Sequence, residues 1–299
     1  MRNFRTAIRN FALVDYTNLS ILSIIFIFYL FSFGRSPHKI TVPIILLGLY
    51  LFIFVLSWFR SKIKPSKLKN LIYLLYPVVF MFCLFETFFM ILPYFNELRY
   101  DEILTNIDFN MFGVNPTVWI ETWINPILTD FFYLLYSFYF PLPLFIIIWL
   151  LRKSMFKELE EAILMFLFTY YGAYIIYFFI PAEGPRFFLA ELQNIPLDGW
   201  IISQPIRNLI NFMEPNKLDA FPSLHAAITF TAVIVCFIHN KKQFYIFFPI
   251  FLGIFVSLIY CRYHYVIDGL AGIIWSVAAC FFARKVYSKF NKNFYSSFG

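Results

Sequence analysis

Long apolar runs separated by short polar segments dominate the pattern of hydrophobic and polar positions along this chain. A membrane-spanning helix needs about 20 mostly apolar residues. Eight segments qualify, at residues 13–33, 40–59, 70–95, 127–151, 159–180, 221–238, 243–261 and 263–283. The pattern therefore predicts an all-α, polytopic membrane protein with about eight transmembrane helices.

The composition agrees with this prediction. Hydrophobic residues make up 61% of the chain and charged residues 14%, whereas a soluble domain carries about 25% charged residues. The first apolar run continues to Phe33 without a small-residue cleavage site, so we expect an anchored first span rather than a cleavable signal. No internal repeat or linker divides the chain.

The distribution of Lys and Arg predicts the orientation, because cytoplasmic loops carry an excess of both. With a cytoplasmic N-terminus, the eight spans leave seventeen Lys and Arg residues inside and seven outside. Both termini are therefore expected in the cytoplasm. Basic loops that face anionic lipid account for the net charge of +7, so the charge does not indicate a nucleic-acid partner.

Two loops on the outer side are long. Residues 96–126 are acidic and include the sequence WIETWI at Trp119–Ile124, which is typical of an interfacial amphipathic segment. Residues 181–220 contain Trp200 and several apolar residues, which predict partial order at the membrane surface. Loops of this length are usually functional or disordered.

Three short blocks of polar residues lie at the outer ends of spans: PAEGPR (Pro181–Arg186), AFPSLHAA (Ala220–Ala227) and RYHYVIDGLAG (Arg262–Gly272). An ionisable group beside an apolar segment is costly, so such a group usually has a function. Because the three blocks fall on the same side, they predict one site that faces the periplasm, the lumen or the cell exterior.

His264 and Asp268 lie four residues apart. On a helix this spacing places both on one face, with their Cβ atoms about 5–6 Å apart. The carboxylate can then accept from one ring nitrogen and leave the other unprotonated, which suits a nucleophile or a general base. The simpler alternative is a polar pair that stabilises the helix. Gly269 and Gly272 beside it favour close helix packing.

His225 follows Pro222 and Ser223, which are typical of a helix start. A helix N-terminus favours a phosphate, and His225 in the first turn is placed to give a proton to a leaving oxygen. The alternative is a solvent-facing histidine beside a capping serine. Ser223 as a nucleophile with His225 as its base is rejected, because residues two apart point to different faces.

Arg186 follows the turn-forming pair Gly184 and Pro185, and a guanidinium matches phosphate oxygens. An interfacial arginine that extends towards water is the alternative. Arg262 is a candidate for a second phosphate contact. A metal site would have to use the two histidines and Asp268, whose spacing is better explained as a base and its orienting group, so neither a metal nor another cofactor is predicted.

Together the blocks resemble the phosphatidic acid phosphatase type 2 superfamily, whose signature combines an Arg block, a P-S-x-H block that opens a helix, and a final H-x-x-x-D block. The resemblance covers roughly residues 160–285. The forms P-A-x-G-P-R, F-P-S-L-H and H-Y-x-x-D-x-x-A-G are similar to the inositol phosphorylceramide synthase branch. The resemblance implies a six-helix catalytic core, which we expect at residues 127–299. Residues 1–126 are expected to hold the N-terminal helices and the first outer loop, and both parts are expected to form one integrated domain.

The resemblance also implies roles for single residues. His264 matches the nucleophile that forms a phosphohistidine, Asp268 its orienting carboxylate, and His225 the acid that protonates the leaving group. Arg186 matches the arginine of the first block, and Ser223 matches a phosphate contact in the second.

The chain departs from the broad family pattern at three positions. Phe179 and Leu258 stand where the family has a Lys and an Arg, and Leu224 replaces a Gly. Arg262 is a candidate to replace one missing cation. Because a phosphodiester carries less charge than a phosphomonoester, it needs fewer cations, and the pattern favours headgroup transfer over simple phosphate hydrolysis.

The predicted function is therefore a metal-independent membrane enzyme that transfers a phospholipid headgroup to an alcohol. A lipid phosphate phosphatase, which hydrolyses phosphatidic acid or an isoprenyl phosphate, is the alternative within the same class. A non-catalytic lipid-binding or transport protein and a scaffold that recruits partners through the two outer loops are alternatives from other classes. The expected partners are a phospholipid or lipid phosphate substrate and an alcohol acceptor.

Overall fold

The computed structural model describes residues 11–62, 67–213 and 218–296. Within these ranges every regular element is a helix, and the only β-type pairing is an isolated parallel bridge between Ala182 and Asp219. The prediction of an all-α protein is confirmed. Arg2, Arg5, Arg9, Lys64 and Lys217, which contribute to the predicted orientation, lie outside the described residues.

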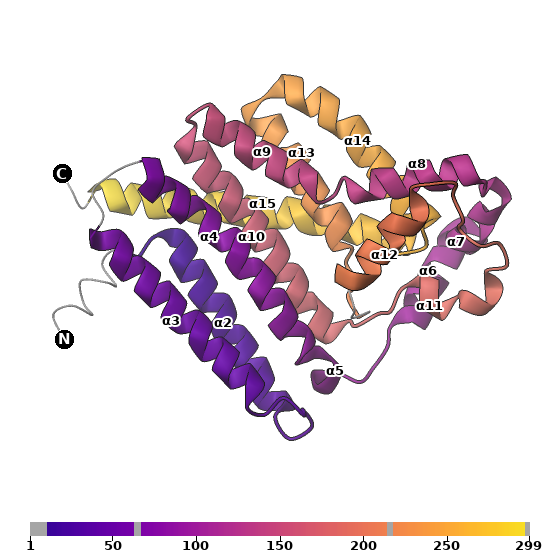
Figure 1. The fold of residues 1–299 in the computed structure, drawn as a ribbon, viewed down its shortest axis with the longest axis horizontal. Helices are drawn as coiled ribbons and strands as arrows, with labels where there is room; N and C mark the ends of the chain where they lie inside the picture. The colour runs from indigo at the N-terminus through magenta and orange to yellow at the C-terminus, as the bar shows by residue number, and fades with distance from the viewer. Residues whose placement is uncertain (1–10, 63–66, 214–217, 297–299) are drawn as a thin grey trace. The chain divides into compact units, whose positions relative to one another are not determined.

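The helices follow the apolar runs of the sequence (Figure 1). In chain order they are α2 (Leu13–Ser32), α3 (Thr41–Lys62), α4 (Lys67–Phe89), α5 (Leu92–Phe95), α6 (Asp101–Phe112), α7 (Pro116–Trp119), the 3₁₀ helix η1 (Ile120–Trp123), α8 (Pro126–Ser137), α9 (Pro141–Arg152), α10 (Phe156–Phe179), α11 (Pro185–Phe188), the 3₁₀ helix η2 (Ala190–Leu192), α12 (Ser203–Met213), α13 (Leu224–His239), α14 (Lys241–Tyr260) and α15 (Val266–Ser296).

Six described helices are long and apolar enough to cross a membrane, and a bent pair raises the number to seven if it forms one span. The six are α2, α3, α4 with α5, α10, α14 and α15, and the pair is α8 with α9, which meet at an angle of 43°. A polytopic membrane protein is thus confirmed, whereas the count of eight is not. The predicted span at 221–238 forms α13, whose 16 residues rise only about 24 Å, less than the roughly 30 Å of the hydrocarbon core.

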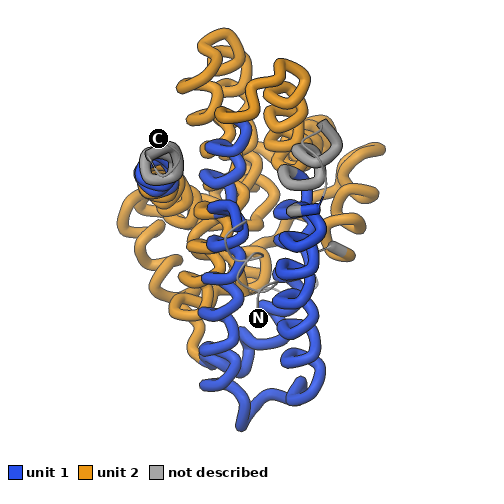
Figure 2. Tube along the Cα trace, turned by 90° about the vertical axis from the view of Figure 1, so that its left-hand side faces the viewer, with its two compact units in different colours: residues 1–97, 159–167, 283–299 blue, residues 98–158, 168–282 orange. Residues whose placement is uncertain are grey.

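The chain divides into two compact units (Figure 2). The first comprises residues 1–97, 159–167 and 283–299. Within it, α2, α3 and α4 pack together, and the carboxylate of Asp15 accepts hydrogen bonds from Arg60 and Tyr76. Asp15 is buried, so this ion pair removes the cost of an unpaired charge among apolar helices.

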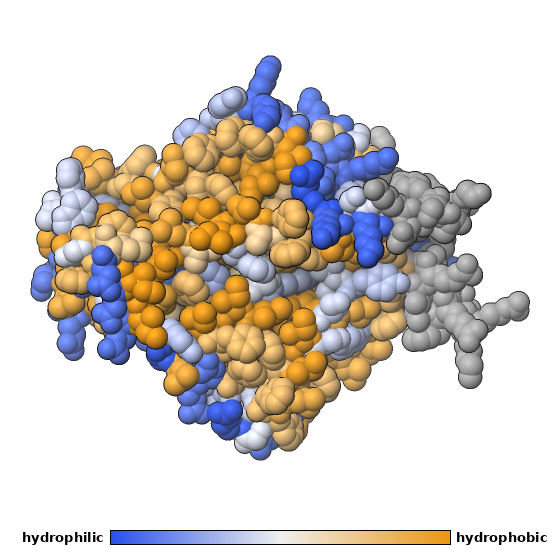
Figure 3. Space-filling model, turned by 180° about the vertical axis from the view of Figure 1, so that it is seen from behind, coloured by the Kyte–Doolittle hydropathy of each residue, from blue (hydrophilic) through white to orange (hydrophobic). Residues whose placement is uncertain are grey.

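The second unit comprises residues 98–158 and 168–282 and contains all three polar blocks. In it α13 packs against α9 and α14, while α8 packs against α12 and α14. A Cβ atom on Gly272 of α15 would overlap the backbone oxygen of Ser223, so the predicted close packing at this glycine is confirmed. Apolar side chains cover broad areas of the face in Figure 3, as expected for helices that contact lipid. The boundary predicted at residue 126 stays a prediction.

Candidate active site

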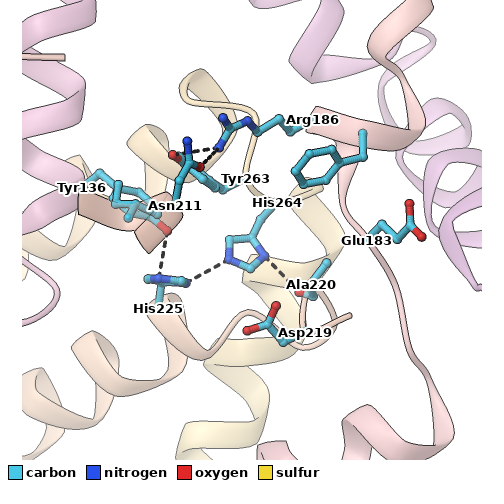
Figure 4. Close-up of a pocket in the computed structure, with 11 residues that line it drawn as sticks. Tyr136, Glu183, Arg186, Asn211, Asp219, Ala220, His225, Tyr263 and His264 are labelled. Atoms are coloured by element: carbon cyan, nitrogen blue, oxygen red, sulfur yellow. Dashed lines mark hydrogen bonds between the residues drawn. The ribbon is translucent and has the colours of Figure 1, made fainter. Parts of the chain in front are cut away.

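A pocket in the second unit collects side chains from all three polar blocks (Figure 4). Arg186, His225 and His264 all line it, although the sequence separates the first from the last by 78 residues. The complete lining is Tyr136, Glu183, Arg186, Phe187, Ile210, Asn211, Asp219, Ala220, His225, Tyr263 and His264. The blocks therefore form one site, as their position at the ends of apolar segments predicts.

Backbone hydrogen bonds hold the three blocks together. The N–H group of Ala220 in the second block donates to the carbonyl oxygen of Ala182 in the first, at 3.1 Å. The N–H group of Ser223 donates to the carbonyl oxygen of Asp268 in the third, at 2.9 Å. Because these contacts involve the main chain, they fix the relative position of the blocks independently of the catalytic side chains.

A chain of hydrogen bonds links the two histidines to Tyr136 and Ala220 (Figure 4). His264 Nδ1 lies 2.9 Å from the Ala220 oxygen. A carbonyl oxygen only accepts, so Nδ1 carries the proton, and in a neutral ring Nε2 is then unprotonated. His225 Nδ1, at 3.0 Å, therefore donates to His264 Nε2. His225 Nε2 lies 2.8 Å from the Tyr136 hydroxyl oxygen.

The environment of His264 favours the neutral imidazole. Burial lowers its pKa well below the ordinary value of 6.5, and charge on His225 lowers this pKa further, while the hydrogen bond to Ala220 opposes both effects. The side chain is 4% exposed, so water does little to stabilise an imidazolium there. An unprotonated Nε2 near neutral pH is the form that a nucleophile requires.

Asp268 does not share a helix face with His264, and this prediction is wrong. Helix α15 begins at Val266, so His264 precedes it. The carboxylate Oδ2 lies 3.6 Å from His264 Nδ1, which is longer than a hydrogen bond. It accepts instead from the N–H group of Tyr265, at 2.8 Å. The atom that accepts from the imidazole is the carbonyl oxygen of Ala220. The Asp268 carboxylate lies near the same ring nitrogen but farther away.

Ser223 begins α13, as the sequence predicts. Its hydroxyl oxygen accepts from the N–H group of Ala226 at 3.3 Å, and it is the N-cap residue. The side chain is buried and does not line the pocket, so a phosphate contact through Ser223 has no support in this geometry. His225 lies in the first turn, as predicted, but it is buried rather than facing solvent.

Arg186 provides a positive charge at the pocket. Its Nη1 donates to Asn211 Oδ1 at 3.0 Å and to the Tyr263 hydroxyl at 3.2 Å, and its guanidinium carbon lies 5.2 Å from the centre of the Tyr263 ring. Among the described residues that line the pocket, it is the only Lys or Arg, whereas Glu183 and Asp219 contribute two carboxylates. The described part of the pocket lining is therefore poor in cations.

Arg262 does not line the pocket, so a direct phosphate contact through it is not supported. The residue has a left-handed backbone (φ 63°) just after α14. Its Nη2 donates to Glu121 Oε1 at 2.6 Å and to the Ile195 oxygen at 2.8 Å. The guanidinium thus joins the turn before His264 to both long loops, residues 96–126 and 181–220.

Two carboxylates of α6 accept hydrogen bonds from backbone N–H groups of the first and third blocks, and neither contact was identified from the sequence. Asp101 accepts from the N–H groups of Glu183 and Gly184, at 2.9 and 2.8 Å. Asp108 accepts from the N–H groups at positions 266 and 267, at 2.7 and 2.9 Å, where α15 begins. Both are buried, as is Leu104 between them. The seven-residue spacing on one helix face was the available signal.

Asp130 of α8 accepts backbone hydrogen bonds in the same way from the loop at residues 181–220. Its carboxylate accepts from four consecutive backbone N–H groups, at residues 200–203, over 2.8–3.0 Å. These groups lie at the start of α12, where N–H groups have no partner within the helix. The sequence places Asp130 near the interface but does not reveal this contact, because the partners are backbone atoms of a distant loop.

No group of three or more His, Cys, Asp or Glu side chains within the described ranges is placed to hold a metal ion. His225, His264 and Asp268 are near one another, but each histidine nitrogen already has a hydrogen-bond partner in the chain from Tyr136 to Ala220. The arrangement brings two hydrogen-bonded histidines and one arginine to the same pocket.

Comparison with known proteins gives one match. No curated protein and no solved structure matches the chain. A protein-family model described as the PAP2 superfamily matches residues 104–282, more than half of the chain and including every residue that lines the pocket. The geometry of the site and the extent of this match lead to the same conclusion: the chain belongs to the PAP2 superfamily.

Proposed function

We propose that this protein is a membrane lipid phosphotransferase that acts through a phosphohistidine on His264 and needs no metal ion. Membership of the superfamily indicates a phosphatase or phosphotransferase of lipid phosphates. The observation that carries the finer proposal is the hydrogen bond of 3.0 Å from His225 Nδ1 to His264 Nε2. It supports an unprotonated nucleophilic nitrogen beside a proton donor.

The proposed reaction has two halves. In the first, His264 Nε2 attacks phosphorus, the bond from phosphorus to the leaving alcohol breaks, and His225 Nδ1 gives its proton to the leaving oxygen. In the second, the acceptor hydroxyl gives its proton back to His225 and attacks the phosphorus, which releases His264. Arg186 binds the non-bridging oxygens throughout. Asp268 supports the third block next to His264.

The charge of the pocket supports a phosphodiester donor and an alcohol acceptor. One arginine faces two carboxylates among the lining residues, which suits a monoanionic diester better than a dianionic monoester. Headgroup transfer similar to that of inositol phosphorylceramide synthase fits this balance. Hydrolysis of a lipid phosphate would follow the same first half with water as the acceptor.

We also propose that the site faces the non-cytoplasmic side and that both termini are cytoplasmic. The excess of Lys and Arg in the loops away from the three blocks supports this orientation. A single cysteine placed at Glu191 in the second outer loop, in a variant without the four native cysteines, should react with a membrane-impermeant maleimide in sealed vesicles whose non-cytoplasmic face is outward. Reaction only in vesicles of the opposite orientation would contradict the proposed orientation.

Purified protein with a phospholipid that carries a radiolabelled headgroup phosphate tests the function. The reaction is run with and without a ceramide or diacylglycerol acceptor, and the His264→Ala variant is the control. A new labelled lipid that depends on the acceptor supports transfer, and labelled phosphate in water indicates hydrolysis instead. Binding of the phospholipid without turnover, with or without the acceptor, would overturn both transfer and hydrolysis and would favour a lipid-binding protein.

A further inference from the structure

We infer that Tyr136 is a positioning residue for the proposed acid His225, and that its hydroxyl determines which ring nitrogen delivers the proton. This inference rests on the proposed function. Tyr136 lies at the end of α8, 89 residues before His225, and it belongs to none of the three polar blocks. Its hydroxyl oxygen is nevertheless 2.8 Å from His225 Nε2.

The surroundings hold this contact in place. Tyr136 is fully buried and His225 is 8% exposed. The Tyr136 ring stacks on Tyr263 with centroids 4.6 Å apart and lies 4.9 Å from the His225 ring. Tyr139 contacts the imidazole from another side, with centroids 4.1 Å apart. Rings packed on several sides hold the hydroxyl beside Nε2.

The Tyr136 contact selects the orientation of the His225 ring. His225 can act on the phosphorus attached to His264 only through the nitrogen that faces it, which is Nδ1. If Nε2 had no polar partner, the ring could turn over, or the neutral ring could carry its proton on Nε2. In the second case two unprotonated nitrogens, His225 Nδ1 and His264 Nε2, would face each other. The polar partner at Nε2 disfavours the first arrangement, and the unprotonated Nε2 of His264, which needs a donor, disfavours the second.

A tyrosine hydroxyl suits this position because it both donates and accepts. While His225 is charged, its Nε2–H group donates to the Tyr136 oxygen. After Nδ1 has given its proton to the leaving oxygen, the neutral ring keeps the proton on Nε2, and the same bond persists. When the resting ring is neutral and carries its proton on Nδ1, the hydroxyl rotates and donates to Nε2, and the ring takes up one proton from water at Nε2 before it acts as the acid. The ring therefore stays in place through the whole cycle, and no proton passes to Tyr136.

Several titratable groups face His225 and enter its pH dependence. Within the described residues, those that contact it or share the pocket are His264 on the third block, Arg186 and Glu183 on the first, Asp219 on the second, Tyr263 beside His264, and Tyr136 and Tyr139 from α8 and its end. Of these, Tyr136 contacts the imidazole at Nε2 and His264 contacts it at Nδ1.

Tyr136→Phe tests the role of the hydroxyl, because the ring and its stacking are kept. With a lipid donor we expect kcat to fall about ten- to hundredfold, a part of what general acid catalysis contributes, with KM within about twofold. The alkaline limb of the pH–rate profile should move to lower pH, because the charged ring loses an acceptor. A phosphodiester with a p-nitrophenol leaving group needs little general acid catalysis. The first half of its reaction should therefore be nearly unaffected by Tyr136→Phe.

Tyr260→Phe is the matched control. Like Tyr136→Phe, it removes the hydroxyl of a buried tyrosine. The Tyr260 hydroxyl lies 3.0 Å from Thr129 of α8 and does not contact His225 in this way. Equal losses in the two variants, or equal losses with both leaving groups, would overturn the inference while the wild-type turnover still supports the proposed function. Absence of turnover in the wild type would overturn the proposed function, and the role of Tyr136 with it.

Nitrogen NMR of wild-type protein labelled with ¹⁵N-histidine gives a readout that does not depend on activity. At a pH where both histidines are neutral, the inference predicts that His225 carries its proton on Nδ1, with His225→Gln used to assign the signal. A proton on Nε2 in the resting protein would overturn the inference.

Discussion

His264 Nε2 and His225 Nδ1 share a hydrogen bond of 3.0 Å, so the proposed nucleophile and the proposed acid contact each other before substrate arrives. A phosphorus atom that reaches Nε2 must replace this bond, and His225 Nδ1 then turns its proton towards the substrate. The resting contact thus keeps Nε2 unprotonated and the acid nearby until a phosphoryl group separates the two rings.

The two histidine variants should respond differently to the leaving group. With a lipid donor, both His264→Ala and His225→Ala are expected to lose activity, the second by about 10²- to 10⁴-fold. With a p-nitrophenyl phosphodiester the first half should recover in His225→Ala, because p-nitrophenolate leaves without a proton, but not in His264→Ala. Burst kinetics of p-nitrophenol release measure this. Recovery in His264→Ala instead would reverse the assignment.

The buried state of His264 predicts an acid-sensitive protein. Its pKa in the folded state is well below 6.5, chiefly because of burial, so below about pH 6.5 the unfolded chain binds a proton that the folded chain does not. Stability is therefore lost as the pH falls below this value. The unfolding temperature should drop less between pH 7 and pH 5 in His264→Gln than in the wild type. The acid limb of kcat/KM should also lie below pH 6.5. Equal drops in the two proteins would contradict the neutral, buried imidazole.

How far the sequence predicts this structure depends on the kind of contact. Apolar length identifies the helices, and the spacing of Arg186, His225 and His264 at the ends of apolar segments identifies the site. Contacts between a side chain and distant backbone, as at Asp108 and Asp130, leave no local pattern. The spacing of His264 and Asp268 predicts a shared helix, but the chain turns at Arg262 and α15 starts only at Val266, two residues after His264.

Substitution of Arg186 should lower activity, whereas substitution of Arg262 should lower stability. Arg186→Gln removes the charge at the pocket, and we expect kcat/KM to fall about ten- to hundredfold with little change in stability. Arg262→Gln leaves Glu121, whose side chain is 11% exposed, without its ion pair, and should lower stability by about 3 kcal/mol.

The double variant Arg262→Gln with Glu121→Gln separates the two effects. It removes both charges of the pair, so it should recover part of the lost stability. Thermal unfolding and steady-state kinetics on the same preparations measure both quantities. A stable Arg262→Gln protein with a raised KM would show that this arginine binds substrate after all.

Asp108 is expected to stabilise the start of α15, because it accepts hydrogen bonds from the first N–H groups of that helix. Asp108→Asn keeps the shape but removes the charge and one acceptor atom, so about 1–2 kcal/mol of stability is expected to be lost. Activity should fall as well, because the start of α15 follows His264 by two residues. Glu102→Gln, on an exposed position of the same helix, is the matched control and should change neither. Equal effects of the two substitutions would remove the supporting role assigned to Asp108.

Trapping the covalent intermediate tests the central claim most directly. The protein is mixed with a donor lipid labelled at the headgroup phosphate, without acceptor, and quenched in alkali, where a phosphorus–nitrogen bond survives better than in acid. The account predicts label on the peptide that contains His264, release of that label by acid, transfer to a lipid when an acceptor is added first, and no label in His264→Ala. Label on another residue, or full turnover by His264→Ala, would contradict it.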